Sequence, residues 1–261
     1  MAPEIHDKLN RLREKALAAG VPAEDVERWL ATARPCATLS PKADGPLVGR
    51  LGGPLMLPPG APDPEQLGWL HLAATLDLAA LPADATDLPL PADGTLVLLT
   101  NTDALDSIGE AIRIPPGTPV EEREVIREDA DWFTAGLDAL IHGELRLRRD
   151  VSFPDHDSII DTEAHPHHKA LREAWWSVKS EDPHRGWSLL QIGGYAWDEY
   201  GEIDPVTQGE YGHDPEDPVL LAQWSPGVDN LEGAEICWSG DRGDLAAGRF
   251  DRVVTAMFFA P

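Results

Sequence analysis

One pattern of glycines and apolar segments occurs twice in this chain, in the same order. A glycine pair comes first, then a loop rich in acidic residues or proline, an apolar segment, a second loop, a glycine and another apolar segment. The glycine pairs at 52–53 and 193–194 match at an offset of 141 residues, and the later segments match at 148 and 139. Near-constant offsets indicate an internal duplication of about residues 46–100 and 187–260. Two copies are too few for a solenoid, so we expect two β motifs that share one core.

The repeated segments are short, apolar and bounded by proline or glycine, which is typical of strands. The run TLVLLT at 95–100 is apolar throughout, which indicates a strand buried on both faces. With 23 glycines and 24 prolines, the chain is a poor candidate for a helical bundle. We expect five residues near the centre of the shared core: Leu96, Val97, Leu98, Ile236 and Cys237.

The first 35 residues have a different pattern, which predicts a helical hairpin separate from the β-rich domain at 36–261. Residues 4–19 carry apolar side chains at helical spacing, and Gly20 follows where a helix commonly ends. Pro22 fits the first turn of a second helix, which Pro35 stops. A third helix is expected at 166–179, with one apolar face made of Leu171, Ala174, Trp175 and Val178.

The formal net charge is −25, and nearly all of it lies in residues 51–261, which hold 13 basic and 39 acidic residues. Such a field repels phosphate backbones, so we expect no nucleic-acid partner. It attracts cationic partners. No apolar run approaches the length of a membrane span, and the charged N-terminus has no apolar core of a signal peptide. We therefore expect a soluble cytoplasmic protein with no membrane partner, and two cysteines that stay reduced.

Several segments resemble the YwqG-like family of bacterial domains of unknown function. They are RLGGPLMLP at 50–58, LAATLDLAALP at 72–82, LPADGTLVLL at 90–99, LLQIGGYAW at 189–197, VLLAQW at 219–224 and GDLAAGRFDRV at 243–253. The resemblance covers roughly residues 36–260 and implies an α+β fold that is mostly antiparallel β and roll-like. Thr75 replaces the glutamine usual in the first repeat, whereas Gln223 keeps it in the second. The family has no established reaction, and some relatives sit beside toxin genes, which implies an immunity role.

Signatures of common enzymes are absent from the sequence. It has no phosphate-binding P-loop, dinucleotide fingerprint, HExxH zinc motif, GxSxG elbow or EF-hand loop. Imidazole and carboxylate groups at 155–168 could serve zinc or manganese, and the weak metal candidates are His156, His165 and His167. An exposed histidine-rich loop explains the same residues, so no metal and no cofactor are predicted.

Residues 198–217 form an acidic loop that contains no lysine or arginine. Its acids are Asp198, Glu199, Glu202, Asp204, Glu210, Asp214, Glu216 and Asp217. The loop could be a solvated surface, a cation-binding surface or a docking site for a basic protein. Tyr195 and Trp197 precede it, and tryptophan is favoured in protein and ligand contacts.

These features favour a non-enzymatic protein-binding or immunity-type module. Its mechanism would be electrostatic capture of a basic protein such as a toxin, followed by occlusion. The predicted contacts are Tyr195, Trp197, Asp214, Glu216 and Asp217. The alternative is an enzyme of unassigned class, with hydrolysis as one option, that uses a groove between the two repeats. Its weak catalytic candidates would be Gln223, His184, Asp198 and Glu199.

Overall fold

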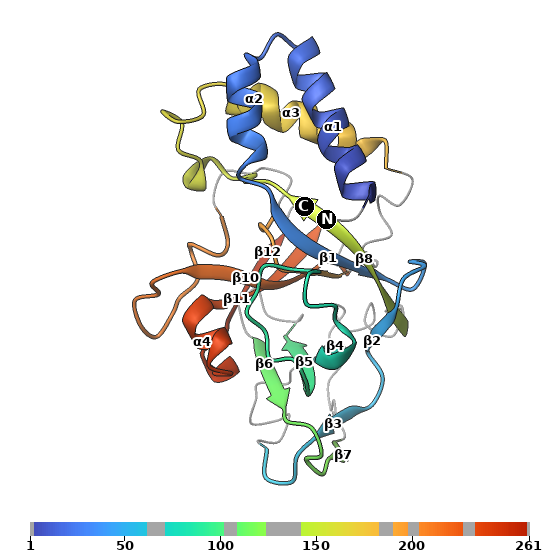
Figure 1. The fold of residues 1–261 in the computed structure, drawn as a ribbon. Coiled ribbons are helices and arrows are strands. Elements are labelled where there is room, and N and C mark those ends of the chain that lie inside the picture. Colours follow the sequence, from blue (N-terminus) through green and yellow to red (C-terminus); the bar gives the residue numbers. More distant parts are fainter. Residues whose placement is uncertain are drawn as a thin grey trace.

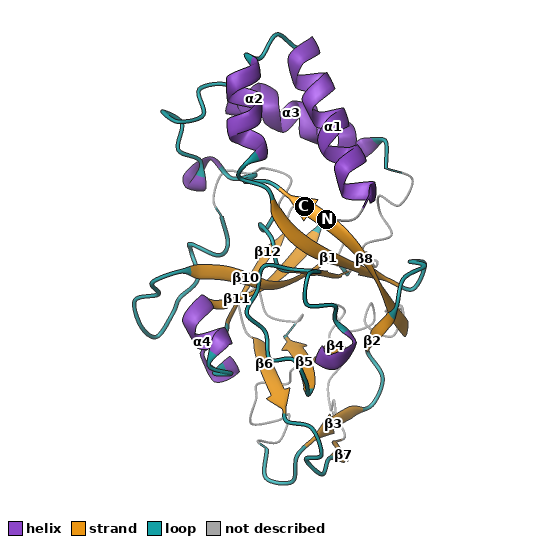
Figure 2. Ribbon diagram, viewed as in Figure 1, coloured by secondary structure: helices purple, strands orange, loops and turns teal. Residues whose placement is uncertain are grey.

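The computed structural model describes residues 3–61, 71–101, 109–123, 142–182, 190–197, 204–226 and 233–259. Its helices are α1 (Pro3–Ala18), α2 (Ala23–Leu30), α3 (His168–Ser180) and α4 (Arg242–Ala246). Its strands are β1 (Arg34–Ser40), β2 (Leu47–Leu51), β3 (Leu55–Leu57), β4 (His71–Asp77), β5 (Thr95–Thr100), β6 (Gly109–Ile114), β7 (Glu121–Arg123), β8 (Gly143–Ser152), β9 (Leu190–Ile192), β10 (Pro218–Trp224), β11 (Ala234–Asp241) and β12 (Val254–Phe259). Figures 1 and 2 show α1, α2 and α3 gathered on one side of the strands, with β3 and β7 at the opposite end.

Ten strands form one sheet in the order β12-β11-β10-β9-β1-β8-β2-β4-β5-β6, and all neighbours are antiparallel. The edge strands approach each other: a Cβ added to Gly109 of β6 would lie 2.6 Å from the hydroxyl oxygen of Thr255 on β12. The indole N–H of Trp238 on β11 donates to the carbonyl oxygen of Leu99 on β5, at 3.0 Å. The sheet is therefore a nearly closed barrel, which confirms the predicted α+β, mostly antiparallel fold.

The two halves of the sheet pair with the same register, so the two β motifs are related as the sequence predicts. Arg50 on β2 lies opposite Thr75 on β4, and Gln191 on β9 lies opposite Gln223 on β10. The second pair follows the first at the offsets of 141 and 148 residues found in the sequence. Strands β4 and β10 also have register shifts at matching places, between Leu72 and Ala74 and between Leu220 and Ala222.

The third repeated segment differs from its sequence match by one residue. The glycine-based match places Leu96 with Glu235, at an offset of 139. In the sheet Leu96 lies opposite Leu76, and Ile236 lies opposite Trp224, so Leu96 corresponds to Ile236 at an offset of 140. The glycines at 94 and 233 lie in the turns before the strands, with φ of 96° and 77°. A turn can vary in length, so its glycine does not fix the strand register.

The five residues expected at the centre of the core are all at most 1% exposed, but they lie on two faces of the sheet. Leu96, Leu98 and Ile236 belong to the large cluster inside the barrel. Val97 and Cys237 point outward, because successive side chains of a strand alternate between its faces. Val97 packs with residues of β3, whereas Cys237 packs with residues between 196 and 220. Val97 is thus covered by residues that follow the first glycine pair, and Cys237 by residues that follow the second.

Helices α1 and α2 form the predicted hairpin. Gly20 follows α1 with φ of 83°, a conformation that favours glycine, and Pro22 is the N-cap of α2 rather than part of its first turn. With α3, the hairpin packs on the end of β8, where the rings of Trp29 and Phe153 stack with centroids 6.2 Å apart. Helix α3 buries its predicted face of Leu171, Ala174, Trp175 and Val178. Within the described ranges, no helix has the length and apolar character needed to cross a membrane.

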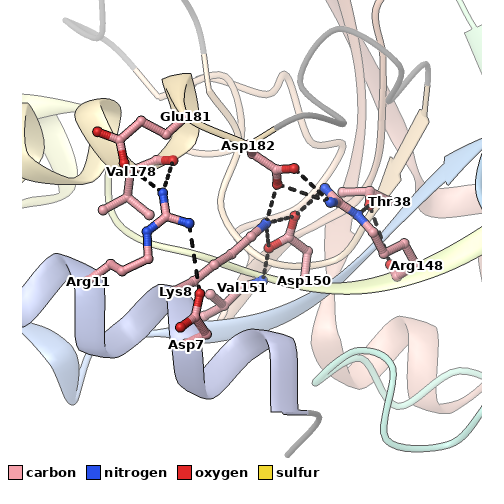
Figure 3. Close-up of polar contacts among 10 residues, drawn as sticks. All are labelled: Asp7, Lys8, Arg11, Thr38, Arg148, Asp150, Val151, Val178, Glu181 and Asp182. Atoms are coloured by element: carbon pink, nitrogen blue, oxygen red, sulfur yellow. Dashed lines mark hydrogen bonds and ion pairs between the residues drawn. The ribbon is translucent and has the colours of Figure 1, made fainter.

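Four charged side chains connect α1, the end of α3 and β8, as Figure 3 shows; we call Lys8, Arg148, Asp150 and Asp182 the Lys8 network. The Lys8 ammonium lies 2.8 Å from a carboxylate oxygen of Asp150 and 2.7 Å from one of Asp182. The Arg148 guanidinium lies 3.1 Å and 3.0 Å from carboxylate oxygens of the same two residues. Each charge therefore has two opposite neighbours, which fixes the position of the helices on the sheet.

Candidate functional site

A cleft of about 270 Å³ lies between the helical layer and the second half of the sheet. Its walls come from residues 29–34, the loop at 154–165, residues 194–196 after β9, the turn at 204–207 and the start of β10 at 218–220. We call it the Tyr195 cleft. It brings together the second glycine pair, one predicted contact residue and the beginning of the acidic loop.

The second glycine pair fixes Tyr195 in the wall of this cleft. Gly193 and Gly194 have φ of 69° and 77°, and a Cβ at Gly194 would lie 2.3 Å from the hydroxyl oxygen of Ser152. The space left by that glycine lets the backbone N–H of Tyr195 donate to the Ser152 hydroxyl at 2.9 Å. The Tyr195 hydroxyl donates to the carbonyl oxygen of Thr32 at 3.1 Å, and the Arg34 guanidinium lies 4.3 Å from its ring centroid. Burial raises the pKa of the Tyr195 phenol, which keeps its proton available for that bond.

Two glutamines hold the chain that follows the glycine pair. The Gln191 amide donates to the carbonyl oxygens of Gly193 and Tyr195, at 3.0 Å and 2.9 Å. The Gln223 amide accepts from the backbone N–H of Trp197 at 3.0 Å and donates to the Trp197 carbonyl at 2.6 Å. It also donates to the Glu235 carboxylate at 3.0 Å. Gln223, a weak catalytic candidate, therefore positions the backbone beside the cleft and has both ends of its amide occupied.

The corresponding loop of the first half uses a different side chain for the same purpose. Arg50, the counterpart of Gln191, donates to the carbonyl oxygen of Pro54 at 2.8 Å. Pro54 and Tyr195 occupy matching positions after their glycine pairs. The two loops share a backbone route, but only the second presents an aromatic polar residue to a cleft.

Three polar atoms at the cleft have no hydrogen-bond partner among the residues that the structure describes. They are Oδ1 of Asp204, Nε1 of Trp29 and Nδ1 of His165. Asp204 is 4% exposed and Trp29 is fully buried. The other carboxylate oxygen of Asp204 accepts from the backbone N–H of Thr207 at 3.3 Å. Because buried polar groups are nearly always hydrogen-bonded, three open positions at one cleft indicate a place for a polar ligand.

The charge of Asp204 is only weakly compensated. Its Oδ1 lies 4.0 Å from Nε2 of His156, which is beyond hydrogen-bonding distance. Burial raises the pKa of the Asp204 carboxyl above its ordinary value of 3.8, while His156, the backbone N–H groups of Val206 and Thr207, and Arg34 act in the opposite direction. The cleft therefore holds a carboxyl group whose burial outweighs the interactions that favour its charged form.

The predicted acidic contacts lie on the segment that continues from this wall. Asp214 and Glu216 are exposed, whereas Asp217 forms an ion pair with Arg242 at 2.7 Å. The backbone N–H groups of Glu216 and Asp217 donate to one carboxylate oxygen of Asp241, at 2.8 Å and 2.9 Å. Asp241 thus fixes the end of the segment and holds its exposed carboxylates in place.

Trp197 lies outside the cleft wall. Its half-buried ring meets that of Trp176 on α3 edge-on, with centroids 6.3 Å apart, and the Lys179 ammonium lies 5.3 Å from its ring centroid. The sequence predicts Trp197 as a contact residue because it precedes the acidic loop. In the structure, packing against α3 accounts for the position of its ring.

The three histidines have separate environments. His156 is fully buried, and its Nε2 lies 3.2 Å from the carbonyl oxygen of Ala196. The His165 ring meets Trp29 edge-on, and Nδ1 of His167 lies 2.5 Å from Asp25. Throughout the described part of the chain, no group of three or more His, Cys, Asp or Glu residues could hold a metal ion. His184, Asp198 and Glu199 lie outside the described residues.

Comparisons with known proteins add no family. No family model matches the chain, and no curated protein matches its sequence. The resemblance to the YwqG-like family therefore stays a prediction. The sequence identified Tyr195 and the acidic loop, but it missed Trp29 and Arg34, which reach the cleft from the other end of the chain. The only local signal for Trp29 is an indole on the apolar face of a short helix.

Proposed function

We propose that the protein is a non-enzymatic binding module of the YwqG-like type that captures a basic protein, such as a toxin, by an immunity-type mechanism. Its contact surface would be the acidic segment at 204–217 together with the Tyr195 cleft. The positively charged partner would be attracted first and then held by a side chain inserted into the cleft.

The observation that carries this proposal is the continuity of charge and cleft. The acidic segment begins at Asp204, a carboxyl with one unpartnered oxygen in the cleft wall, and continues to exposed Glu210, Asp214 and Glu216. Exposed charges of one sign accelerate the encounter with an oppositely charged partner. A buried group that can be paired on docking then adds to the lifetime of the complex. Residues 204–217 carry both the exposed charges and the buried carboxyl group.

Binding is favoured over catalysis by the way the polar groups beside the cleft are used. Gln223 is fully engaged with Trp197 and Glu235, and Glu235 also accepts from the Ser225 hydroxyl at 2.7 Å and 2.8 Å. Groups held in this way support the loop and are not presented to a substrate. Inside the cleft, the Tyr195 hydroxyl is already bound to the Thr32 carbonyl, and the Asp204 carboxyl lies 4.0 Å from the buried imidazole of His156.

The test is binding kinetics with a partner captured from the native host on the immobilised protein. The double variant Asp214→Asn/Glu216→Gln should slow association by about two- to fivefold and leave dissociation nearly unchanged, because exposed charges act mainly on encounter. Raising the salt concentration should reduce this difference, since charges are screened beyond about 8 Å at physiological ionic strength. Asp217 is kept because its carboxylate pairs with Arg242.

The matched control is Glu14→Gln/Asp44→Asn, which removes two exposed carboxylates from α1 and from the loop between β1 and β2. It changes the net charge by the same amount at a distance from the segment. Association that slows equally in both variants would show a general charge effect and would remove the acidic segment as the contact surface.

A further inference from the structure

Two residues that line the Tyr195 cleft carry a complementary pair of buried, unpartnered groups. Oδ1 of Asp204 is a hydrogen-bond acceptor, and Nε1–H of Trp29 is a donor. Both side chains are more than nine-tenths buried, and neither atom has a hydrogen-bond partner in the described ranges. Leaving such groups unpaired costs about 1–3 kcal/mol each, and more for a charged group. A ligand that fits must therefore offer a donor to Asp204 and an acceptor to Trp29.

The geometry of Asp204 selects the kind of donor. Its Oδ2 already accepts from Thr207, so one oxygen is open. A guanidinium prefers both oxygens of a carboxylate, in a bidentate arrangement. An ammonium group is a compact charge with three donors, and it can bind a single oxygen. The cationic Arg34 does not fill this role, because its side chain lies over Tyr195 and 3.9 Å from Asp87.

The size and lining of the cleft limit the rest of the ligand. The volume of about 270 Å³ equals that of roughly nine water molecules in the liquid. Part of the wall is apolar, including Ile160, Val206 and Leu220. A short carbon chain bearing one ammonium group and one acceptor would fill this space and cover that wall.

We propose that the Tyr195 cleft binds a primary ammonium group carried on a short carbon chain, together with a hydrogen-bond acceptor on the same chain. The ammonium binds Oδ1 of Asp204, and the acceptor binds the indole N–H of Trp29, with Nδ1 of His165 as a second polar contact. The source is either a free amino acid or the lysine side chain of a basic protein. In the second case the inference rests on the proposed function.

Calorimetric titration with three small probes tests this proposal. Nα-acetyl-lysine methylamide represents a lysine within a protein, and free norleucine represents an amino acid with an apolar side chain. Nα-acetyl-norleucine methylamide has the same carbon chain but no ammonium. We expect at least one of the first two to bind and the third not to bind. Binding of blocked lysine alone assigns the site to a protein partner, and binding of norleucine alone assigns it to a free amino acid.

Asp204→Asn should weaken binding of the active probe by at least tenfold, whereas Asp44→Asn, which removes an exposed carboxylate outside the cleft and the acidic segment, should change it less than twofold. His165→Phe, which changes no charged carboxylate, should weaken it severalfold. Thermal unfolding of each variant shows whether it is folded. No binding by either ammonium probe, equal binding by the blocked norleucine, or an Asp204→Asn variant that binds normally would each overturn the proposal. A missing protein partner combined with norleucine binding would contradict the proposed function and leave this inference intact.

Discussion

The Lys8 network and the Tyr195 cleft both bury polar side chains where the helical layer meets the sheet. The buried carboxylates differ in how many hydrogen-bond and ion-pair partners they have. In the network, Asp150 contacts Lys8 at 2.8 Å and Arg148 at 3.1 Å, and it also accepts from the backbone N–H of Val151. In the cleft, Oδ1 of Asp204 has no hydrogen-bond partner among the described residues, and Nε2 of His156 lies 4.0 Å from it. The two carboxylates are similarly buried, with side chains 12% and 6% exposed.

This difference between the partners of Asp150 and those of Asp204 indicates a structural role for the Lys8 network and a binding role for the Tyr195 cleft. A buried charge with several partners specifies how two elements pack, and removing one partner leaves the others uncompensated. A buried carboxyl group with one unpartnered oxygen costs stability in the free protein, and a bound water, ion or ligand can supply the missing partner. The network therefore explains how the hairpin is held, and the cleft is the place to look for binding.

The largest expected effect is the loss of the network cation. Lys8→Met should lower the free energy of unfolding by about 3 kcal/mol, because Asp150 and Asp182 would lose one of the two cations that they share. Urea denaturation measures this loss. Arg13→Met is the matched control, since Arg13 also lies on α1 but pairs with Glu27 in an exposed position. The control should lose less than about 1 kcal/mol. Equal losses would mean that the network does no more than a surface ion pair.

Thiol labelling compares the packing of the two regions without changing them. Both cysteines are buried thiols, and burial raises the pKa of the Cys36 thiol, with a further contribution from Asp150. Cys237 belongs to a small buried cluster that includes Ala196 and Val206 of the cleft wall. We expect Cys237 to react about tenfold faster than Cys36 under native conditions, because small clusters open more easily. Mass spectrometry of partly labelled protein gives both rates, and faster reaction of Cys36 would contradict this ranking.

The smallest effect is a dependence of stability on pH at Asp204. Because burial raises the pKa of this carboxyl in the folded protein, its contribution to stability is lost as pH rises through the folded pKa. Asp204→Asn removes that dependence. The variant should be about 1 kcal/mol more stable than the wild type at pH 7, and the difference should disappear below the unfolded pKa of about 3.9. A difference that is constant with pH would show that the charge of Asp204 is not the cause.

Short patterns in the sequence were enough to predict most helices and strands and the relation between the two β motifs. Helical spacing predicted α1, α2 and α3, and the two glycine pairs predicted two related β motifs that share one core. That the two motifs join into a single ten-stranded sheet was not predicted. The register of the third segment was wrong by one residue, because a turn glycine does not fix the strand that follows it. Alternation along β5 and β11 would have placed Val97 and Cys237 on the outer face, but a continuous apolar run hides that alternation.

The site was only partly predictable. Tyr195 and the acidic loop stand out by type and position, but eight acids in one loop give no sign that Asp204 is the one that becomes buried. Trp29 and Arg34 are about 160 residues before Tyr195 in the sequence. They reach the cleft because β1 lies beside β9, a pairing that joins the beginning of the chain to its second half. Whether a buried polar atom finds a partner depends on such contacts and cannot be inferred from local patterns.

The most direct measurement compares the same substitution at the two buried carboxylates. Asp150→Asn and Asp204→Asn each replace a carboxylate by an amide of nearly equal size, and the free energy of unfolding is measured for both at pH 7. The account predicts different outcomes for the two variants. Asp150→Asn should lose about 2 kcal/mol, because Lys8 and Arg148 lose one of the two anions that they share, whereas Asp204→Asn should show no loss or a gain of about 1 kcal/mol. A loss for Asp204→Asn as large as that for Asp150→Asn would contradict the claim that the Tyr195 cleft holds its carboxyl unpaired for a ligand.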